Sequence, residues 1–172
     1  LWMAGSGALG GHVQTIWPAL FSHAHDPLQV CGAASDRGTR VSYARQRWDT
    51  PDGDFIDVDV LLPPGWQPGV SPLLVLLHGL EGSSQSHYAR AFASWAQQRG
   101  WAYVVPHFRG CSGEPNRAPR FYHSGDHEEI DWMLKRVVAQ WGGPVSVVGV
   151  SLGGNALLRW AQEAGATASQ LA

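Results

Sequence analysis

Charged residues are scarce in this 172-residue chain, where Asp, Glu, Lys and Arg together make up 15%. The formal net charge is −2 and the 12 Lys and Arg residues are scattered, so no basic patch attracts a phosphate backbone. Long hydrophobic runs are also lacking, because the longest clean one, 73–77, is far shorter than the roughly 20 residues of a membrane helix. The sequence therefore predicts a protein with no nucleic-acid partner and no transmembrane segment.

Cysteine is nearly absent too. Cys31 and Cys111 lie far apart without the spacing of metal ligands, which fits a reduced, cytoplasmic protein that needs no metal or other cofactor. The first residues lack the basic stretch that opens a signal peptide, so we expect none. Because the chain begins with Leu and stops just after a predicted helix, we expect a fragment of a longer protein.

Hydrophobic residues, by contrast, make up 44% of the chain, enough for one globular domain with a real core. Residues 40–172 are predicted to form one α/β domain, or the first part of one. Residues 1–39 show little periodicity, and we expect an N-terminal extension packed on the body through one short helical face. The members of that face are Ile16, Trp17, Leu20 and Phe21.

The domain is expected to open with a β-hairpin, since residues 40–48 and 55–62 alternate in polarity around a Pro-Asp-Gly turn. Beyond residue 72 the pattern changes to strand, loop and helix, repeated, which predicts a mostly parallel sheet with helices on both faces. Ligands of such sheets bind at the carboxyl ends of the strands, where His78, His107 and Ser151 fall. The expected elements are, in order, strand 73–77, helix 86–99, strand 101–105, a helix from Asp126, strand 145–150 and a helix after Ser151.

The stretch around Ser151 carries the clearest chemistry. Gly149 and Gly153 flank the serine in a G-x-S-x-G pattern between a strand and a helix, where a sharp turn needs small residues. Such a turn lifts the hydroxyl clear of the sheet and leaves the Leu152 amide free at a helix N-terminus. A plain glycine-rich turn is the alternative, but the strand before and the helix after it favour a nucleophile.

Taken together, the motifs resemble those of the α/β-hydrolases, and most closely the bacterial YheT-like hydrolases, relatives of the eukaryotic abhydrolase-domain lipid esterases. The resemblance covers 11–165 and departs mildly at Val13, where the family usually has leucine. It implies an α/β-hydrolase fold that is cut after the nucleophile helix. The matching segments are G-H-V-Q-T, P-D-G-D-F, H-G-L-E-G-S, R-G-W, H-F-R-G-C-S-G-E-P-N-R, Y-H-S-G and G-V-S-L-G-G-N.

The resemblance implies an esterase acting on short-chain or lipid esters, such as monoacylglycerols, through a Ser–Asp–His triad and an acyl-enzyme. Ser151 matches the nucleophile, and the Leu80 and Leu152 amides match the oxyanion hole. In this fold the acid and then the histidine follow the serine, yet only Glu163 and no histidine follow Ser151 here. We therefore expect the acid and base beyond Ala172 and no turnover by this chain alone. A non-catalytic member of the fold, or an inactive truncated product, is the rival hypothesis.

Other polar residues are interpreted as structural. His78 and His107 precede the serine, so we expect them to support loops rather than act as the base. A metal pair at His123 and His127 is disfavoured because a helix is expected to start between them. Arg109 is expected to brace its loop through carbonyls and a carboxylate such as Glu114.

The helices and the last strand carry three further predictions. Asp126 and Glu129 have the spacing of a capping box at the start of a helix. The strand at 145–150 should be a sheet edge with incomplete helix cover, which invites aggregation. Four of the nine tryptophans are expected to pack inward from helix faces, with lining of an acyl pocket as the alternative for some. They are Trp95, Trp132, Trp141 and Trp160.

Overall fold

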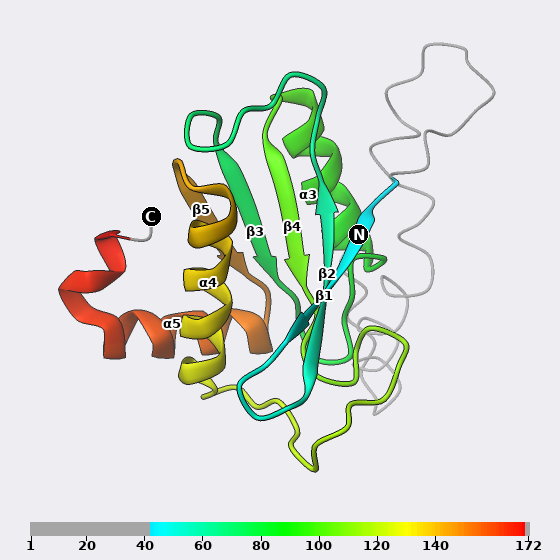
Figure 1. Cartoon of the computed structure of the whole chain (residues 1–172), viewed down its shortest axis with the longest axis vertical. Helices are drawn as coiled ribbons and strands as arrows, with labels where there is room; N and C mark the ends of the chain where they lie inside the picture. Colours follow the sequence, from blue (N-terminus) through cyan, green and yellow to red (C-terminus); the bar gives the residue numbers. More distant parts are fainter. Residues whose placement is uncertain (1–41, 171–172) are drawn as a thin grey trace, which may run out of the picture. The chain divides into compact units, whose positions relative to one another are not determined.

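The predicted hairpin is present at the start of the part that the computed structural model describes, residues 42–170. Its strands, β1 (Ala44–Asp49) and β2 (Phe55–Leu61), pair antiparallel (Figure 1). The Thr50 amide donates to the Asp54 carbonyl at 3.0 Å, and Gly53 takes φ +79°, a conformation open to glycine. The extension predicted for residues 1–39 lies outside the described residues.

Three parallel strands complete a five-stranded sheet in the order β1-β2-β4-β3-β5. They are β3 (Leu73–Leu77), β4 (Ala102–Pro106) and β5 (Val145–Gly149), each within one residue of its prediction. β4 pairs antiparallel with β2 and parallel with β3, which in turn pairs with β5. The mostly parallel α/β architecture predicted from the strand–helix alternation is confirmed.

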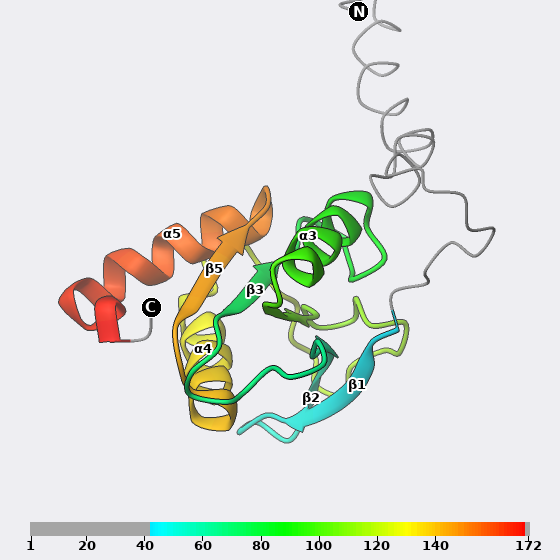
Figure 2. The same ribbon diagram turned by 90° about the horizontal axis from the view of Figure 1, so that it is seen from above.

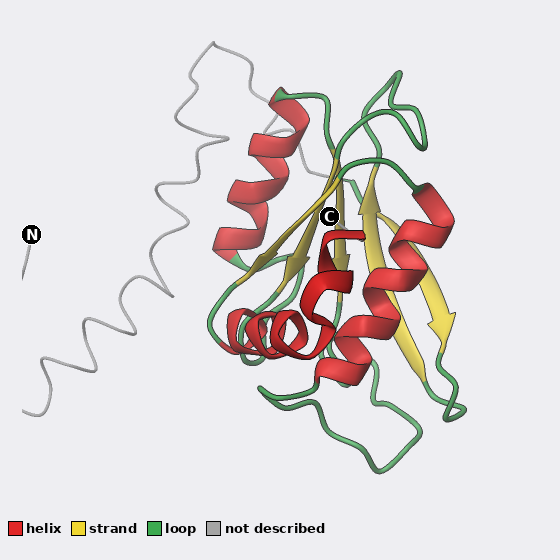
Figure 3. Cartoon of the chain, turned by 90° about the vertical axis from the view of Figure 1, so that its left-hand side faces the viewer, coloured by secondary structure: helices red, strands yellow, loops and turns green. Residues whose placement is uncertain are grey.

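Helices cover both faces of this sheet. Side chains of α4 (His127–Trp141) and α5 (Leu152–Ala164) share one apolar cluster with the strands, and those of α3 (His87–Gln98) share the other. Figures 2 and 3 show the strands between these two layers, with the short 3-10 helix η2 (Gly165–Gln170) after α5. Successive β3 residues face opposite clusters, so all five are apolar and buried.

The buried face of α3 differs from its prediction. It is made of Ala89, Ala93 and Ala96, and these small side chains let the helix lie close to the sheet. The larger side chains are pushed to the flanks, so the prediction that Trp95 packs inward is wrong: 37% of it is exposed, and its ring meets Trp101 at 5.1 Å. The remaining helix tryptophans do pack against the core: Trp132 in part, and Trp141 and Trp160 fully.

The predicted sheet edge is also confirmed among residues 42–170, where β5 pairs with one strand only, β3. Its cover on the α3 side is partial: a groove of about 490 Å³ runs there between Val148 and the aromatic side chains of Phe92 and Trp101. Within residues 42–170 we find no helix with both the length and the apolar character needed to cross a membrane.

Candidate active site

Ser151 occupies the turn between β5 and α5 with φ 51° and ψ −114°. A non-glycine residue in this region is strained by about 1–3 kcal/mol, and its side chain is exposed. Two glycines make the turn possible: a Cβ on Gly149 would lie 2.6 Å from the Gly153 carbonyl oxygen, and one on Gly153 would lie 2.5 Å from that of His78. The geometry is the predicted strand–turn–helix, while a catalytic role for the serine stays a prediction.

The loop after β3 reaches this serine because β3 and β5 are parallel neighbours whose carboxyl ends meet at one edge of the sheet. The Val150 amide donates to the Leu77 carbonyl at 3.0 Å, and a Cβ on Gly79 would lie 3.4 Å from the Ser151 Cβ. Neither the Leu80 nor the Leu152 amide donates a hydrogen bond to any described residue. Two backbone amides with no partner among the described residues, one following Ser151 and one following Gly79, are therefore close to the exposed serine in the fold.

His78 is a buried structural residue, as predicted. Its Nε2 accepts a hydrogen bond from the Phe108 amide at 3.0 Å, and its Nδ1 lies 2.8 Å from the Gly79 carbonyl oxygen. Burial lowers the pKa of His78 to about 4, so the ring is neutral at pH 7 and donates from Nδ1. It ties the loop after β4 to the loop after β3.

His107 is likewise structural, and it belongs to a buried network around Asp59. The His107 Nε2 lies 3.3 Å from both the Ser84 amide and the Asp59 carboxylate, and the Ser84 hydroxyl donates to Asp59 at 2.5 Å. Arg45 binds the same carboxylate through two bonds of 2.7 and 2.8 Å. Burial alone would raise the pKa of Asp59, but these hydrogen bonds outweigh it and hold the pKa below the ordinary value.

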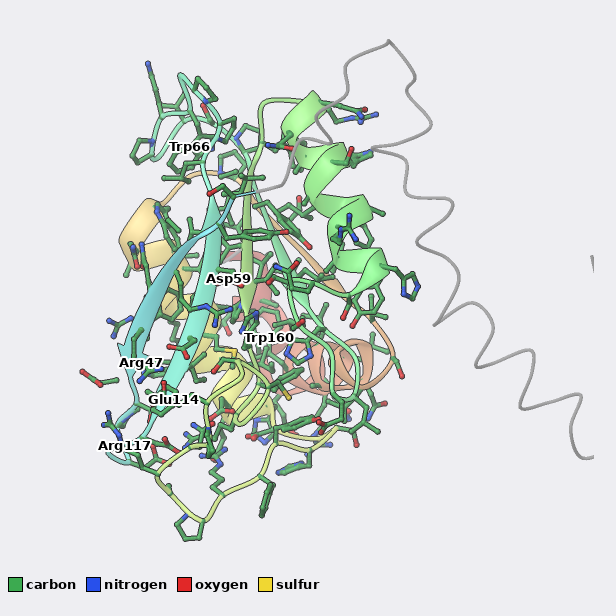
Figure 4. The ribbon with its side chains drawn as sticks, turned by 90° about the vertical axis from the view of Figure 1, so that its right-hand side faces the viewer. Arg47, Asp59, Trp66, Glu114, Arg117 and Trp160 are labelled. Carbon is green, nitrogen blue, oxygen red and sulfur yellow. The ribbon has the colours of Figure 1, made fainter. Side chains whose placement is uncertain are left out.

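This network was not predicted from the sequence, although the register of the hairpin carries a signal for it. Arg45 stands opposite Asp59 and Arg47 opposite Asp57, so the alternation places two acids on one face with two guanidinium partners across from them. Both acids are buried, where an alternating strand suggested exposure. In Figure 4, Asp59 lies inside the molecule, while Arg47 lies beside Glu114 at the hairpin end, where they pair at 2.6 Å.

Arg109 does brace its loop, but through partners other than the predicted Glu114. Its guanidinium binds Glu129 at 2.6 Å, and Asp54 and Asp52 each at 2.9 Å. The predicted capping box is wrong for the same reason, because Glu129 is turned toward this buried arginine. The Asp126 side chain makes no cap bond and accepts from Arg120 at 2.6 Å instead.

Metal ligation finds no support at His123, whose Nδ1 accepts a hydrogen bond from the nearby Gly125 amide at 3.2 Å. Across residues 42–170, no group of three or more His, Cys, Asp or Glu side chains is placed to hold a metal ion. Asn155 was not predicted to have a role, yet its side chain donates to the Ser124 carbonyl at 3.0 Å and connects α5 to the loop before α4.

The sheet order, the two helix layers and the serine turn define the class, an α/β protein with its site at the carboxyl ends of parallel strands. Within that class the chain belongs to the family described as having the alpha/beta hydrolase fold, whose model matches residues 72–169. The chain is 44% identical over 147 residues to YheT of Escherichia coli (strain K12), whose name assigns it provisionally to the esterases. The resemblance to YheT-like hydrolases is confirmed.

That match covers 85% of this chain but 39% of YheT, so the chain spans about two fifths of the length of this relative. Phospholipase ABHD3 of Homo sapiens is 28% identical over 125 residues, covering 70% of this chain and 31% of its own length. Among solved structures, the α/β serine hydrolase XC6422 of Xanthomonas campestris, described as lacking a lid, superposes with a TM-score of 0.57 at 24% identity. That superposition covers 71% of this chain and 56% of XC6422. It supports the fold alone.

Proposed function

We propose that this chain is the N-terminal part of an α/β-hydrolase domain that hydrolyses carboxylic esters, with Ser151 as the nucleophile. The observation that carries the proposal is the Ser151 turn itself. The Ser151 backbone is strained and the residue is exposed. The amides of Leu80 and Leu152, close to it in the fold, have no partners among the described residues. Strain of this kind persists where the surrounding structure enforces it, and it gathers at functional sites.

In the proposed reaction, the Ser151 Oγ attacks the ester carbonyl carbon as a base takes its proton, giving a tetrahedral oxyanion. The Leu80 and Leu152 amides donate to that oxyanion, an interaction worth roughly 3 kcal/mol of barrier for each donor. The carbon–oxygen bond to the alcohol then breaks, the alcohol leaves with the proton, and an acyl-serine remains. Water attacks the acyl group in the same way, which releases the carboxylic acid and restores the serine hydroxyl.

The acid and base of this reaction are proposed to lie beyond Ala172. Glu163, the one carboxylate that follows Ser151 in this sequence, pairs with Arg159 at 2.5 Å, and no histidine follows Ser151. The fold orders the triad as serine, acid and histidine along the chain, which matches an acid and base from later strands. We therefore expect residues 1–172 alone to show no esterase turnover.

The proposed substrate is a small-molecule ester of a short-chain or lipid acid. Two observations support this class: similar proteins carry esterase and phospholipase names, and Leu80, the residue after Gly79 in the loop that reaches the serine, is 68% exposed. An apolar side chain there suits an acyl chain better than a charged group. The scarcity of cysteine supports a reducing, cytoplasmic location as part of the same proposal.

A fluorophosphonate probe tests the nucleophile directly, because it reacts only with an activated serine. We expect the full natural chain to be labelled, and Ser151→Ala to abolish that labelling. Ser124→Ala is the matched control, since Ser124 is an exposed serine on a neighbouring loop and its replacement should leave labelling unchanged. Labelling that survives Ser151→Ala would refute the proposal.

A further inference from the structure

The two amides on either side of Leu80 are each bound by a tyrosine hydroxyl. The Gly79 amide donates to the Tyr88 hydroxyl at 2.9 Å, and the Glu81 amide donates to the Tyr122 hydroxyl at 3.0 Å. The Leu80 amide between them binds no described residue. The loop is therefore arranged so that the one amide matching an oxyanion donor is left unoccupied.

Tyr122 holds its side of the loop by two bonds. Besides accepting from the Glu81 amide, its hydroxyl donates to the Glu81 carboxylate at 2.9 Å. Glu81 has φ 52°, and within residues 42–170 only Ser151 shares a positive φ among the non-glycine residues. A conformation with this cost persists only where contacts enforce it, and the hydroxyl of Tyr122 supplies two such contacts.

Tyr122 is itself fixed in place. Its ring stacks on that of Phe108 with centroids 5.2 Å apart and planes 7° from parallel, and the Phe108 amide donates to His78. Burial raises the pKa of Tyr122 above its ordinary value, so the hydroxyl stays protonated and available to donate. The loops after β3 and β4 are thus joined through a side chain whose ring and hydroxyl both have partners.

Tyr88 binds the loop from a different element, the first turn of α3. A Cβ on Gly79 would lie 3.6 Å from the Tyr88 hydroxyl oxygen and 3.4 Å from the Ser151 Cβ, so this bond lies close to the serine. Its anchor is a helix, whereas the anchor of Tyr122 is a loop. The two hydroxyls therefore hold the amides flanking Leu80 from two separate elements of the fold.

We propose that Tyr122 and Tyr88 are positioning residues, which bind the amides flanking Leu80 so that, of these three loop amides, only that of Leu80 points at the developing oxyanion. The inference rests on the proposed function and adds the device that orients one of its two donors. A donor aimed before the reaction stabilises the transition state without reorganising, and its effect depends steeply on where it points. Losing the Tyr122 hydroxyl should therefore slow the chemical step and leave ground-state binding of the ester unchanged.

The test compares Tyr122→Phe with wild type in the full natural chain, using a p-nitrophenyl ester and a trifluoromethyl ketone. Removing an oxyanion donor costs about 10²–10³ in kcat, so misdirecting one should lower kcat by about 10- to 100-fold. We expect KM to stay within about 2-fold. The ketone forms a hemiketal oxyanion on the serine, so its affinity should fall by the same factor as kcat.

Tyr103→Phe is the matched control. It removes a buried tyrosine hydroxyl that donates to the Ala89 carbonyl at 2.9 Å, a tyrosine–backbone bond outside the loop. It should lose stability and keep kcat. If Tyr122→Phe does not fold, Tyr88→Phe is measured in its place, with the same loss of kcat and of ketone affinity expected.

Two results separate this inference from the proposed function. If the fluorophosphonate labels Ser151 but the tyrosine variant keeps kcat and ketone affinity at the Tyr103→Phe level, positioning by the tyrosines is refuted and the esterase proposal stands. If wild type is not labelled at Ser151, the proposed function is refuted and the positioning role with it. A loss confined to kcat and ketone affinity supports the inference.

Discussion

Replacing Gly153 by alanine should cost more stability than the same replacement at Gly154, its neighbour in the first turn of α5. A Cβ there would lie 2.5 Å from the His78 carbonyl oxygen and would also overlap that of Leu77, whereas real Cβ atoms essentially never approach closer than 3.0 Å. Both obstacles are backbone atoms at the end of β3, a strand buried on both faces. Relief requires the helix to move away from the sheet.

The magnitude follows from the cost of overpacking. Inserting a methyl group into a well-packed site costs about 1–3 kcal/mol, and rigid backbone obstacles place Gly153→Ala near the top of that range. Gly154→Ala is the control, because it adds the same group in the same turn of α5 and meets the Gly149 carbonyl oxygen at 3.1 Å, a contact that small shifts relieve. Any gain in helix propensity, up to about 1 kcal/mol, is the same for both and cancels in the comparison.

Thermal and urea unfolding of the two variants provide the assay. A difference of about 2 kcal/mol corresponds to a gap of roughly 4–8 °C in Tm for a chain of this size, with Gly153→Ala the lower. The fluorophosphonate reaction should slow as well, since the displaced turn moves the Leu152 amide. Equal Tm values for the two variants would show that the helix does not press on β3 as the geometry requires.

Further predictions concern the buried charges. Arg109→Lys keeps the charge but loses the fork that binds Glu129 and Asp54. Buried carboxylate oxygens left without a hydrogen bond cost about 1–3 kcal/mol, measurable as a lower urea midpoint. The Arg47 side chain is partly exposed, so Arg47→Lys should cost less than about 1 kcal/mol of stability. A larger loss for Arg47→Lys than for Arg109→Lys would contradict the expected effect of burial. His78 has a pKa near 4 when folded against 6.5 unfolded, so the unfolded chain binds more protons between those values. Stability should fall by up to about 3 kcal/mol as pH drops from 6.5 to 4. Urea unfolding across that range should show this slope, and His78→Gln should remove it; an unchanged slope would refute the assignment.

Local patterns predicted most of the fold. The five apolar residues of β3 define a strand buried on both faces, and the glycines around Ser151 define a turn that few other residues permit. The face of α3 was harder, because hydrophobic size suggested Trp95, while the close approach of helix to sheet selected alanine. That choice depends on the distance between two elements, which no single stretch of sequence contains.

Long-range polar contacts were the other gap. Tyr122 and Glu81 are 41 residues apart, and their bond exists only because parallel strands bring two loops to one edge of the sheet. The sequence offers several carboxylates that could pair with Arg109. Asp54 comes within hydrogen-bonding distance of it only because the hairpin folds. The Ser151 turn was predictable because the glycines that permit it are close by in the sequence. The side chains that bind the neighbouring loop come from residues far from Ser151 in the sequence, so they were not.

The paired charges of the hairpin also disfavour an incorrect register of β1 on β2. If β1 slid by one residue along β2, Arg45 would face a valine and Asp59 would lose its bidentate partner while remaining inside the protein. A slip of one residue also turns every side chain of the strand to the opposite face, so Trp48 would leave the core. Charge and hydrophobic pattern thus disfavour the same one-residue slip independently of each other.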